Sequence, residues 1–272
     1  MKNLTINIAV MTIVVIMQGS CSSRQGTTTI AGFEMIRVEG GTFNMGDRTL
    51  DEGEADEKPV HSVTLNNFYI GKTEVTQKQW FDIMGFIPQY MMFGKGDDYP
   101  VYNVNRNDIQ VFFKRLEKKT GKKFRLPTES EWEYACRGGK YSANYKYSGS
   151  NELNTVAWYC ANSGKMRLKD KEQIYNSLRK NKCATHPVGK HKPNELGIYD
   201  MSGNVWEWCS DLYDDYPSSP QKNPDEEAKG HEYVIRGGGF ADISRTCRIS
   251  NRGKTHYYTH TCDLGFRLAF SE

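Results

Sequence analysis

The sequence has little net charge and no hydrophobic run long enough to cross a membrane. Its 272 residues include 36 Lys and Arg and 33 Asp and Glu, and no stripe of basic residues dominates. These features argue against a nucleic-acid-binding protein. Aromatic residues make up 12% of the chain and charged residues 25%, a composition that argues against disorder. No internal repeat and no Pro- or Ser-rich linker follows residue 29, which favours a single domain.

The only extended apolar stretch, Leu4–Met17, is typical of a signal peptide rather than a membrane-spanning helix. It is shorter than the ~20 residues that a spanning helix needs, and Lys2 gives it a positively charged start. We therefore expect residues 1–20 to be a signal peptide and the rest of the chain to be exported.

Cys21 follows two small residues and precedes a polar segment, as in the lipid-attachment site of bacterial lipoproteins. Gln18 departs from that pattern, which prefers Leu there. We expect Cys21 to carry the lipid and residues 21–32 to contain a polar tether; the alternative is ordinary signal cleavage with an incidental cysteine. The expected location is that of a membrane-anchored lipoprotein of the bacterial cell envelope, facing the periplasm or the surface.

Three segments carry the start signals of helices. Thr76, Asn107 and Thr128 each stand three residues before a Gln or Glu, which predicts a capping interaction at the first turn. Apolar residues follow at helical spacing in each segment. The three helices are expected to end at Gly85, Gly121 and the turn Arg137–Gly139.

Short segments rich in β-branched and aromatic residues predict strands between these helices and around them. They are Phe33–Val38, Thr42–Met45, Val63–Leu65, Phe68–Ile70, Tyr233–Arg236 and Gly265–Phe270. The segment Asp51–Glu57 holds five carboxylates without the spacing of a calcium loop, and we interpret it as a solvated loop. Few helices, short strands and long loops indicate a single domain over residues 33–272.

Several motifs occur in a fixed order along this domain. They are Gly40–Gly46, Lys58–His61, Phe68–Thr76, Arg125–Ala135, Asn194–Trp208, Arg236–Gly238 and Gly265–Arg267. Together they resemble the sulfatase-modifying-factor family, whose named member is the formylglycine-generating enzyme. The resemblance implies a mixed α+β variant of the C-type-lectin-like fold, with little regular secondary structure and a stiffening role for calcium.

The segment Asp200–Glu207 is a candidate calcium site, because two carboxylates flank turn residues and Ca²⁺ prefers oxygen ligands. The resemblance implies side-chain ligands at Asp200 and Glu207 and carbonyl ligands at Gly203 and Val205. The alternative is a turn in which Glu207 forms a salt bridge.

The resemblance also implies a second calcium site, at Asn162 and the carbonyl of Ser163. Its other ligands would fall in the divergent segment Lys165–Lys182, which is rich in Lys and Arg. This second site stays open.

The match to the family fails at its catalytic centre. The formylglycine-generating enzyme oxidises a substrate cysteine with O₂ at a copper ion held by two cysteines, and those positions correspond here to Asp242 and Cys247. Cu(I) prefers soft thiolates to a carboxylate, so we expect no copper site. A family serine near the oxygen pocket is replaced by Gly239, whereas the aromatic residue after it is kept as Phe240. Cys247 is the only catalytic position of the family that this chain retains with a thiol.

Five other cysteines remain in the mature chain, at Cys136, Cys160, Cys183, Cys209 and Cys262. Export permits disulfides, and with Cys247 included six cysteines allow 15 pairings. The resemblance implies that the usual partner of Cys136 is replaced by Leu268, and Cys262 is a candidate substitute.

Two histidines, His256 and His260, stand four residues apart and could share a metal ion on a helix. Their segment has no helix cap, so exposed polar groups of a loop are the favoured interpretation.

Three functional classes compete. The favoured one is a non-catalytic binding or structural lipoprotein of a surface or periplasmic assembly, whose partner is a protein or an exposed peptide or glycan. A variant of it is a variable lectin-fold lipoprotein that binds ligands through Ala241–Thr261, which mixes Asp, Ser, Asn, His and Tyr. The second class is an oxidoreductase that converts cysteine to formylglycine. The third is another oxidative enzyme of the superfamily, such as a maturation factor for an exported protein. A sulfoxide synthase is disfavoured because no additional helical domain is present.

Overall fold

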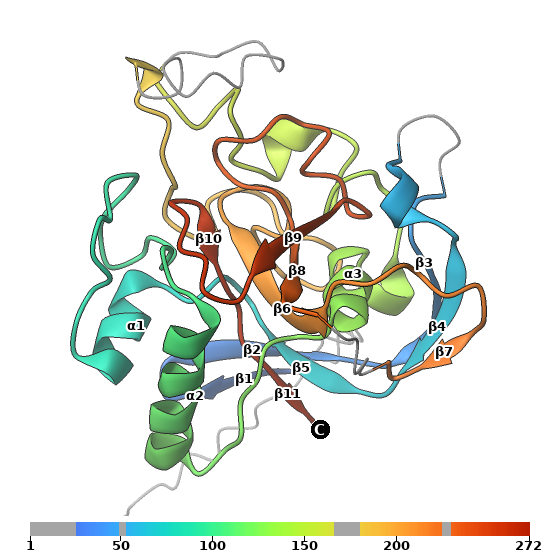
Figure 1. The fold of residues 1–272 in the computed structure, drawn as a ribbon, viewed down its shortest axis with the longest axis horizontal. Coiled ribbons are helices and arrows are strands. Elements are labelled where there is room, and N and C mark those ends of the chain that lie inside the picture. The colour runs from blue at the N-terminus through green and yellow to red at the C-terminus, as the bar shows by residue number, and fades with distance from the viewer. Residues whose placement is uncertain (1–25, 49–52, 166–179, 225–229) are drawn as a thin grey trace, which may run out of the picture.

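The computed structural model describes residues 26–48, 53–165, 180–224 and 230–272. Within these ranges three helices and eleven short strands are joined by long loops, an α+β arrangement as expected (Figure 1). The strands are β1 (Thr27–Ile30), β2 (Phe33–Val38), β3 (Gly41–Met45), β4 (His61–Leu65), β5 (Phe68–Gly71), β6 (Trp206–Leu212), β7 (Gln221–Lys222), β8 (Glu232–Arg236), β9 (Arg252–His256), β10 (Leu264–Gly265) and β11 (Ala269–Ser271). The helices are α1 (Gln77–Met84), α2 (Arg106–Thr120) and α3 (Glu129–Cys136).

The first sheet brings the two ends of the domain together. Its strand order is β1-β2-β5-β11, and all neighbouring pairs are antiparallel. β1 pairs with β2 from Thr27 opposite Ile36 to Ile30 opposite Phe33. This corrects the expected tether over residues 21–32, because Thr27–Ile30 form an edge strand of the folded domain.

The other sheets are smaller and mixed. In the second sheet, of order β10-β6-β8-β9, the β10/β6 pair is parallel and the other pairs are antiparallel. In the third sheet, of order β3-β4-β7, β3 and β4 are antiparallel and β4 and β7 are parallel. The strand expected over Gly265–Phe270 is divided between β10 and β11, which belong to different sheets. Phe266 and Leu268, which lie in the connection between the two strands, are buried in the core. The segment is therefore apolar because its connection is buried, and not because it forms one continuous strand.

The helices begin and end largely where the sequence predicts. Thr76 and Thr128 cap α1 and α3 with reciprocal capping boxes, and glycines with positive φ end α1 and α2. The cap of α2 is Asn105 rather than Asn107: the Asn105 side chain accepts from the N–H of Asp108, whose carboxylate accepts from the N–H of Asn105. No helix in the described ranges has the length and apolarity that crossing a bilayer requires.

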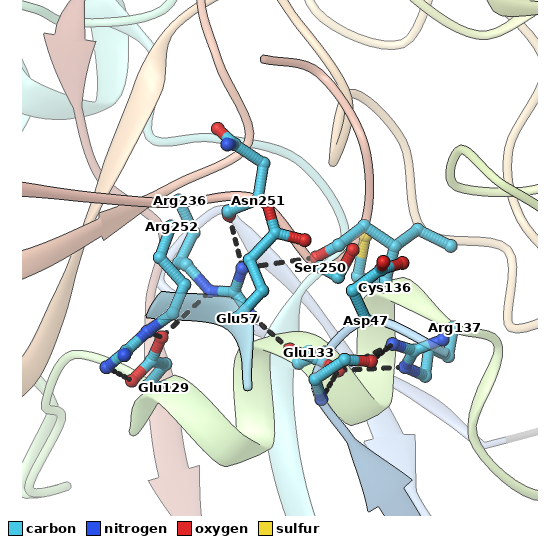
Figure 2. A network of polar contacts seen from close by, with 12 residues as sticks. Asp47, Glu57, Glu129, Glu133, Cys136, Arg137, Arg236, Ser250, Asn251 and Arg252 are labelled. Atoms are coloured by element: carbon cyan, nitrogen blue, oxygen red, sulfur yellow. Dashed lines mark hydrogen bonds and ion pairs between the residues drawn. The ribbon is translucent and has the colours of Figure 1, made fainter. Parts of the chain in front are cut away.

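The core contains charged side chains as well as apolar ones. Figure 2 shows Arg236 between Glu129 and Glu133, with Arg252 on Glu129 and Arg137 on Glu133. All five side chains are buried or nearly so, and they join α3 to β8 and β9.

The described part of the acidic segment, residues 53–57, is not simply solvated. Glu57 is fully buried and accepts from both terminal nitrogens of Arg248, at 2.5 and 2.8 Å. Burial raises the pKa of Glu57, but the hydrogen bonds and charge of Arg248 outweigh it, and the pKa lies below its ordinary value. Asp56 accepts from the hydroxyl of Tyr213 at 2.5 Å. The sequence shows the charges of this segment but not the arginine that returns to it from 191 residues away.

Candidate functional site

The two positions that correspond to the copper-binding cysteines lie in the loop after β8. The Oδ2 atom of Asp242 accepts from the indole N–H of Trp206 at 2.7 Å and from the backbone N–H of Gly239 at 2.8 Å. Cys247 is 0% exposed and lies in an apolar cluster with Phe240. Asp242 is thus an acceptor that fixes its own turn, and the thiol of Cys247 is out of reach of a substrate in this conformation.

The Asp200–Glu207 segment begins as a tight turn. Asp200, Gly203 and Asn204 all have positive φ, at 58°, 81° and 66°. A Cβ on Gly203 would lie 2.3 Å from the carbonyl oxygen of Trp158, so only glycine fits there. The turn directs the Asp200 side chain inward, where its Oδ2 accepts from the N–H of Gly189 at 2.7 Å.

Glu207 is held by an ion pair. Arg267 donates to both of its carboxylate oxygens at 2.6 Å, and the indole N–H of Trp132 donates at 2.8 Å. Both charged side chains are 0% exposed. The salt-bridged alternative for Glu207 therefore describes this geometry.

A third carboxylate, Glu74, lies near these two. It is fully buried between β5 and α1, and its Oε2 accepts from the Asn204 side chain at 3.2 Å. Burial, then the charges of Asp200 and Glu207, hold the pKa of Glu74 well above its ordinary value. Burial also raises the pKa of Asp200, to about 6. Glu74, Asp200 and Glu207, which we call the buried carboxylate cluster, carry three potential negative charges against the single positive charge of Arg267.

The buried carboxylate cluster fits a divalent cation in charge and in donor type. Glu74 Oε1 and Asp200 Oδ1 are buried and have no hydrogen-bond partner among the described residues. A divalent cation would neutralise the two excess charges with hard oxygen ligands. No three His, Cys, Asp or Glu side chains in the described part of the chain are grouped as a metal site, so backbone oxygens would have to complete the coordination. Calcium at Asp200, Gly203, Val205 and Glu207 stays a prediction.

The groups expected at the second calcium site, the Asn162 side chain and the Ser163 carbonyl, form hydrogen bonds with other groups of the protein. The Asn162 amide donates to the carbonyl of Ala157 and accepts from the N–H of Tyr159, both at 2.8 Å. The carbonyl of Ser163 lies 3.0 Å from Nε2 of His186 and accepts from the N–H of Ala184. Most of the segment Lys165–Lys182 lies outside the described residues. Nothing in this geometry supports a second site.

Known proteins resemble this chain over the region that carries the motifs. The family model of the sulfatase-modifying factor enzyme 1-like domain matches residues 22–272. The chain belongs to this family. It is 35% identical to the chaperone protein LppX of Paenibacillus barcinonensis over 93% of this chain and 94% of that protein. It is 28% identical to the formylglycine-generating enzyme of Streptomyces coelicolor over 86% and 88% of the two chains.

Solved structures confirm the C-type-lectin-like fold of this sulfatase-modifying-factor domain. Treponema denticola variable protein 1 superposes with a TM-score of 0.75 at 29% identity, covering 92% of this chain and all of that one. PvdO of Pseudomonas aeruginosa superposes with a TM-score of 0.70 at 24% identity over 93% of this chain and all of that one.

Five of the six cysteines in the described part of the chain are buried, and Cys262 is partly exposed. Burial raises the pKa of the Cys136 thiol to about 12, and its Sγ lies 3.6 Å from the carbonyl of Met201. No disulfide joins Cys136 to Cys262 in the described part of the chain. The suggested replacement bridge is therefore wrong, and Cys21 lies outside the described residues.

The C-terminal segment is only partly a surface. Residues 247–252 are buried, whereas Lys254, His256, Tyr258 and His260 alternate as exposed side chains along β9 and the turn that follows. His256 ends a strand and His260 lies 3.1 Å from Asp108, so the two histidines do not form a helical metal pair. His260 also lines a cavity of about 500 Å³ at the N-terminal end of α2.

That cavity and its apolar surroundings were not predicted. Trp80, Phe86, Tyr90 and Val104 line it with His260, and Tyr90 is 75% exposed. We call these cavity residues, together with the exposed row from Lys254 to His260, the aromatic face. Glu74 and Arg267 were also missed as site residues. Their motifs were recognised, but nothing local in the sequence shows that the two side chains meet Asp200 and Glu207.

Proposed function

We propose that this chain is an exported lipoprotein, anchored through Cys21, whose sulfatase-modifying-factor domain binds a partner instead of oxidising cysteine. The observation that carries the proposal is the position of Asp242. A carboxylate replaces the first copper thiolate, and its Oδ2 is engaged by Trp206 and Gly239. Cu(I) would lose a soft ligand and gain a hard oxygen already bound by two donors.

The similarity to LppX, named a chaperone protein, supports a binding role over nearly the full length of both chains. The aromatic face supplies a surface for it. A concave apolar cavity rimmed by exposed Phe86 and Tyr90 suits an extended peptide that carries apolar side chains. We therefore place partner binding at the aromatic face and make an unfolded polypeptide the expected class of ligand.

The absence of catalysis is tested by metal content and turnover. The purified chain, loaded with Cu(I) and dialysed, should retain less than stoichiometric copper and leave a thiol-containing peptide unoxidised under O₂. Cys247→Ala gives the matched background. Stoichiometric copper with turnover that disappears in Cys247→Ala would establish an oxidoreductase and overturn the proposal.

The binding role is tested with chemically unfolded lysozyme as the probe. The chain should slow lysozyme aggregation, measured by light scattering, and Phe86→Ala with Tyr90→Ala should weaken this effect at least about threefold. The control is Tyr141→Ala with Tyr145→Ala, which removes two exposed aromatic rings elsewhere. Equal loss in both variants, or no effect of the wild-type chain, would refute peptide binding at this face.

A ligand-binding role of the variable lectin type is the second candidate, favoured by the similarity to Treponema denticola variable protein 1. Lys254, His256 and Tyr258 would then contact a glycan rather than a peptide. A glycan array separates the two, since selective glycan binding lost in His256→Ala with Tyr258→Ala would support the lectin role. An array without binding would leave the peptide role as the one supported.

A further inference from the structure

A dense basic cluster lies at the C-terminal end of α2. Between residues 114 and 123 there are six Lys or Arg and one acidic residue, Glu117. The side chains of this cluster, which we call the basic end of α2, are Lys114, Arg115, Lys118, Lys119, Lys122 and Lys123, all exposed except the half-buried Lys122. The near-neutral charge of the whole chain conceals this local excess.

The basic end of α2 lies close to the point where the described chain begins. The ammonium of Lys122 sits 3.8 Å from the ring centre of Phe270 and 6.0 Å from that of Tyr69. Tyr69 is paired with Arg37 across β5 and β2, and the N–H of Arg37 donates to the carbonyl of Gly26 at 3.0 Å. Because neighbouring strands are about 5 Å apart, about two strand spacings separate the backbone of Gly26 from that of Tyr69, whose ring lies near Lys122. Figure 1 shows α2 beside β1 and β2.

The chain between Cys21 and the folded domain is short. Five residues separate Cys21 from Thr27, which begins the edge strand β1. A fully extended chain spans at most about 3.6 Å per residue, so Thr27 stays within about 20 Å of the anchored cysteine. A lipidated protein must therefore hold the β1 side of the domain, and with it the basic end of α2, near the membrane.

We propose that the basic end of α2 rests on an anionic phospholipid bilayer and sets the orientation of the domain. The inference relies on the proposed lipidation of Cys21. Lys side chains within a Debye length of about 8–10 Å are attracted to an anionic surface. The cavity of the aromatic face lies at the opposite end of α2, which has 15 residues and is about 22 Å long. α2 thus acts as a spacer that directs the partner-binding cavity away from the lipid.

The proposal is tested first by amine footprinting of the lipidated full-length protein in vesicles. With 30% phosphatidylglycerol in phosphatidylcholine, acylation of Lys114, Lys118, Lys119 and Lys123 should slow at least threefold compared with pure phosphatidylcholine. Lys182, Lys190 and Lys192 are also exposed and provide the internal reference. In Figure 1 their segment lies far from the C-terminal end of α2. Equal rates in both vesicle types would overturn the proposal.

The second measurement uses a chain without the lipid anchor that keeps the positive charges of α2. The mature chain with Cys21→Ser should sediment with the anionic vesicles at low salt and not with neutral ones. Lys118→Gln, Lys119→Gln and Lys123→Gln together should lower the partition coefficient about 100-fold, since each lysine contributes about fivefold near an anionic surface. Lys182→Gln, Lys190→Gln and Lys192→Gln remove the same charge elsewhere and should change it less than threefold.

Each outcome decides the matter. No sedimentation of the unlipidated chain, or equal losses in the two triple variants, would overturn the docking proposal. Lipid attachment is measured separately by incorporation of an alkyne fatty acid into wild type and Cys21→Ala. Absence of labelling would remove the anchor and with it the proposed function, whatever the vesicle results.

Discussion

At the residue scale, Asp242 is accommodated as a structural residue. Two donors converge on one of its oxygens, one from the indole of Trp206 and one from the backbone of Gly239. Trp206 is the first residue of β6, and Gly239 lies three residues before Asp242 in the same loop. A carboxylate oxygen is a stronger acceptor for these two donors than a cysteine sulfur, so Asp242 suits a structural role in this loop.

We expect Asp242→Ala to lower the free energy of unfolding by about 1–3 kcal/mol, because it leaves two donors without an acceptor. Asp242→Asn keeps an acceptor oxygen and should cost less than about 1 kcal/mol. Urea unfolding followed by tryptophan fluorescence measures both. If the alanine variant is as stable as wild type, the carboxylate has no structural role in the loop.

The buried carboxylate cluster predicts a pH dependence that calcium should remove. Folding raises the pKa of Asp200 to about 6, so its contribution to stability is complete below about pH 4 and is lost as the pH rises through 6. In chelator the free energy of unfolding should fall over this range, and less so in Asp200→Asn. Calcium at 100 times its dissociation constant should restore about 2.7 kcal/mol at pH 7.

Glu74→Gln separates calcium binding from general stability. The amide cannot ionise in this buried position, so in chelator at pH 7.5 this variant should be at least as stable as wild type, with a smaller calcium-induced rise in Tm. Asp211→Asn is the matched control, because burial raises the pKa of Asp211 to about 7 outside the cluster. It should alter the pH dependence and keep the full calcium response. Wild type that purifies without calcium and ignores chelation would refute the site.

At the scale of elements, local sequence signals placed the helices well. Thr76, Gly85, Gly121 and Thr128 act as the sequence predicts, since caps and left-handed C-termini depend on neighbouring residues. The cap of α2 was misplaced by two residues because Asn105 and Asn107 both precede a suitable side chain. In the structure Asn105 forms the reciprocal hydrogen bonds of the cap with Asp108.

The two asparagines give a direct test of this cap. Asn105→Ala should cost about 1 kcal/mol, since it leaves an N-terminal N–H of α2 without its side-chain acceptor. Asn107→Ala loses only an exposed contact with the hydroxyl of Tyr257 and should cost less than about 0.5 kcal/mol. Thermal unfolding at matched protein concentration compares them. A larger effect at Asn107 would return the cap to the position that the sequence favoured.

At the scale of the whole molecule, the charges in the interior were beyond sequence reasoning. Glu129 and Glu133 lie on α3, yet their partners Arg236 and Arg252 come from strands over 100 residues away (Figure 2). The acidic residues of α3 predict a helix with one exposed face, whereas every residue of α3 is buried. Fold class and family followed from the order of the motifs. Contacts that depend on tertiary pairing, including Glu74 and Arg267, did not.

The acidic segment near residue 54 offers the sharpest test of this interior charge. Glu57→Ala leaves the buried guanidinium of Arg248 without its bidentate partner and should cost about 3–5 kcal/mol. Glu54, three residues earlier, pairs with Arg245 at 2.7 Å, with both side chains about half exposed. Glu54→Ala should therefore cost less than about 1 kcal/mol.

The pH profile distinguishes an ion pair from simple packing at Glu57. Its folded-state pKa is lowered, so the stability it contributes is present above its unfolded pKa and is lost as the pH falls through the folded value. The difference in unfolding free energy between wild type and Glu57→Gln should accordingly narrow below about pH 4. Two results would contradict this prediction: a difference between wild type and Glu57→Gln that stays the same at acid pH, or an equal loss of stability in Glu54→Ala and Glu57→Ala. Either would mean that packing of the buried segment, and not its charge, stabilises the fold.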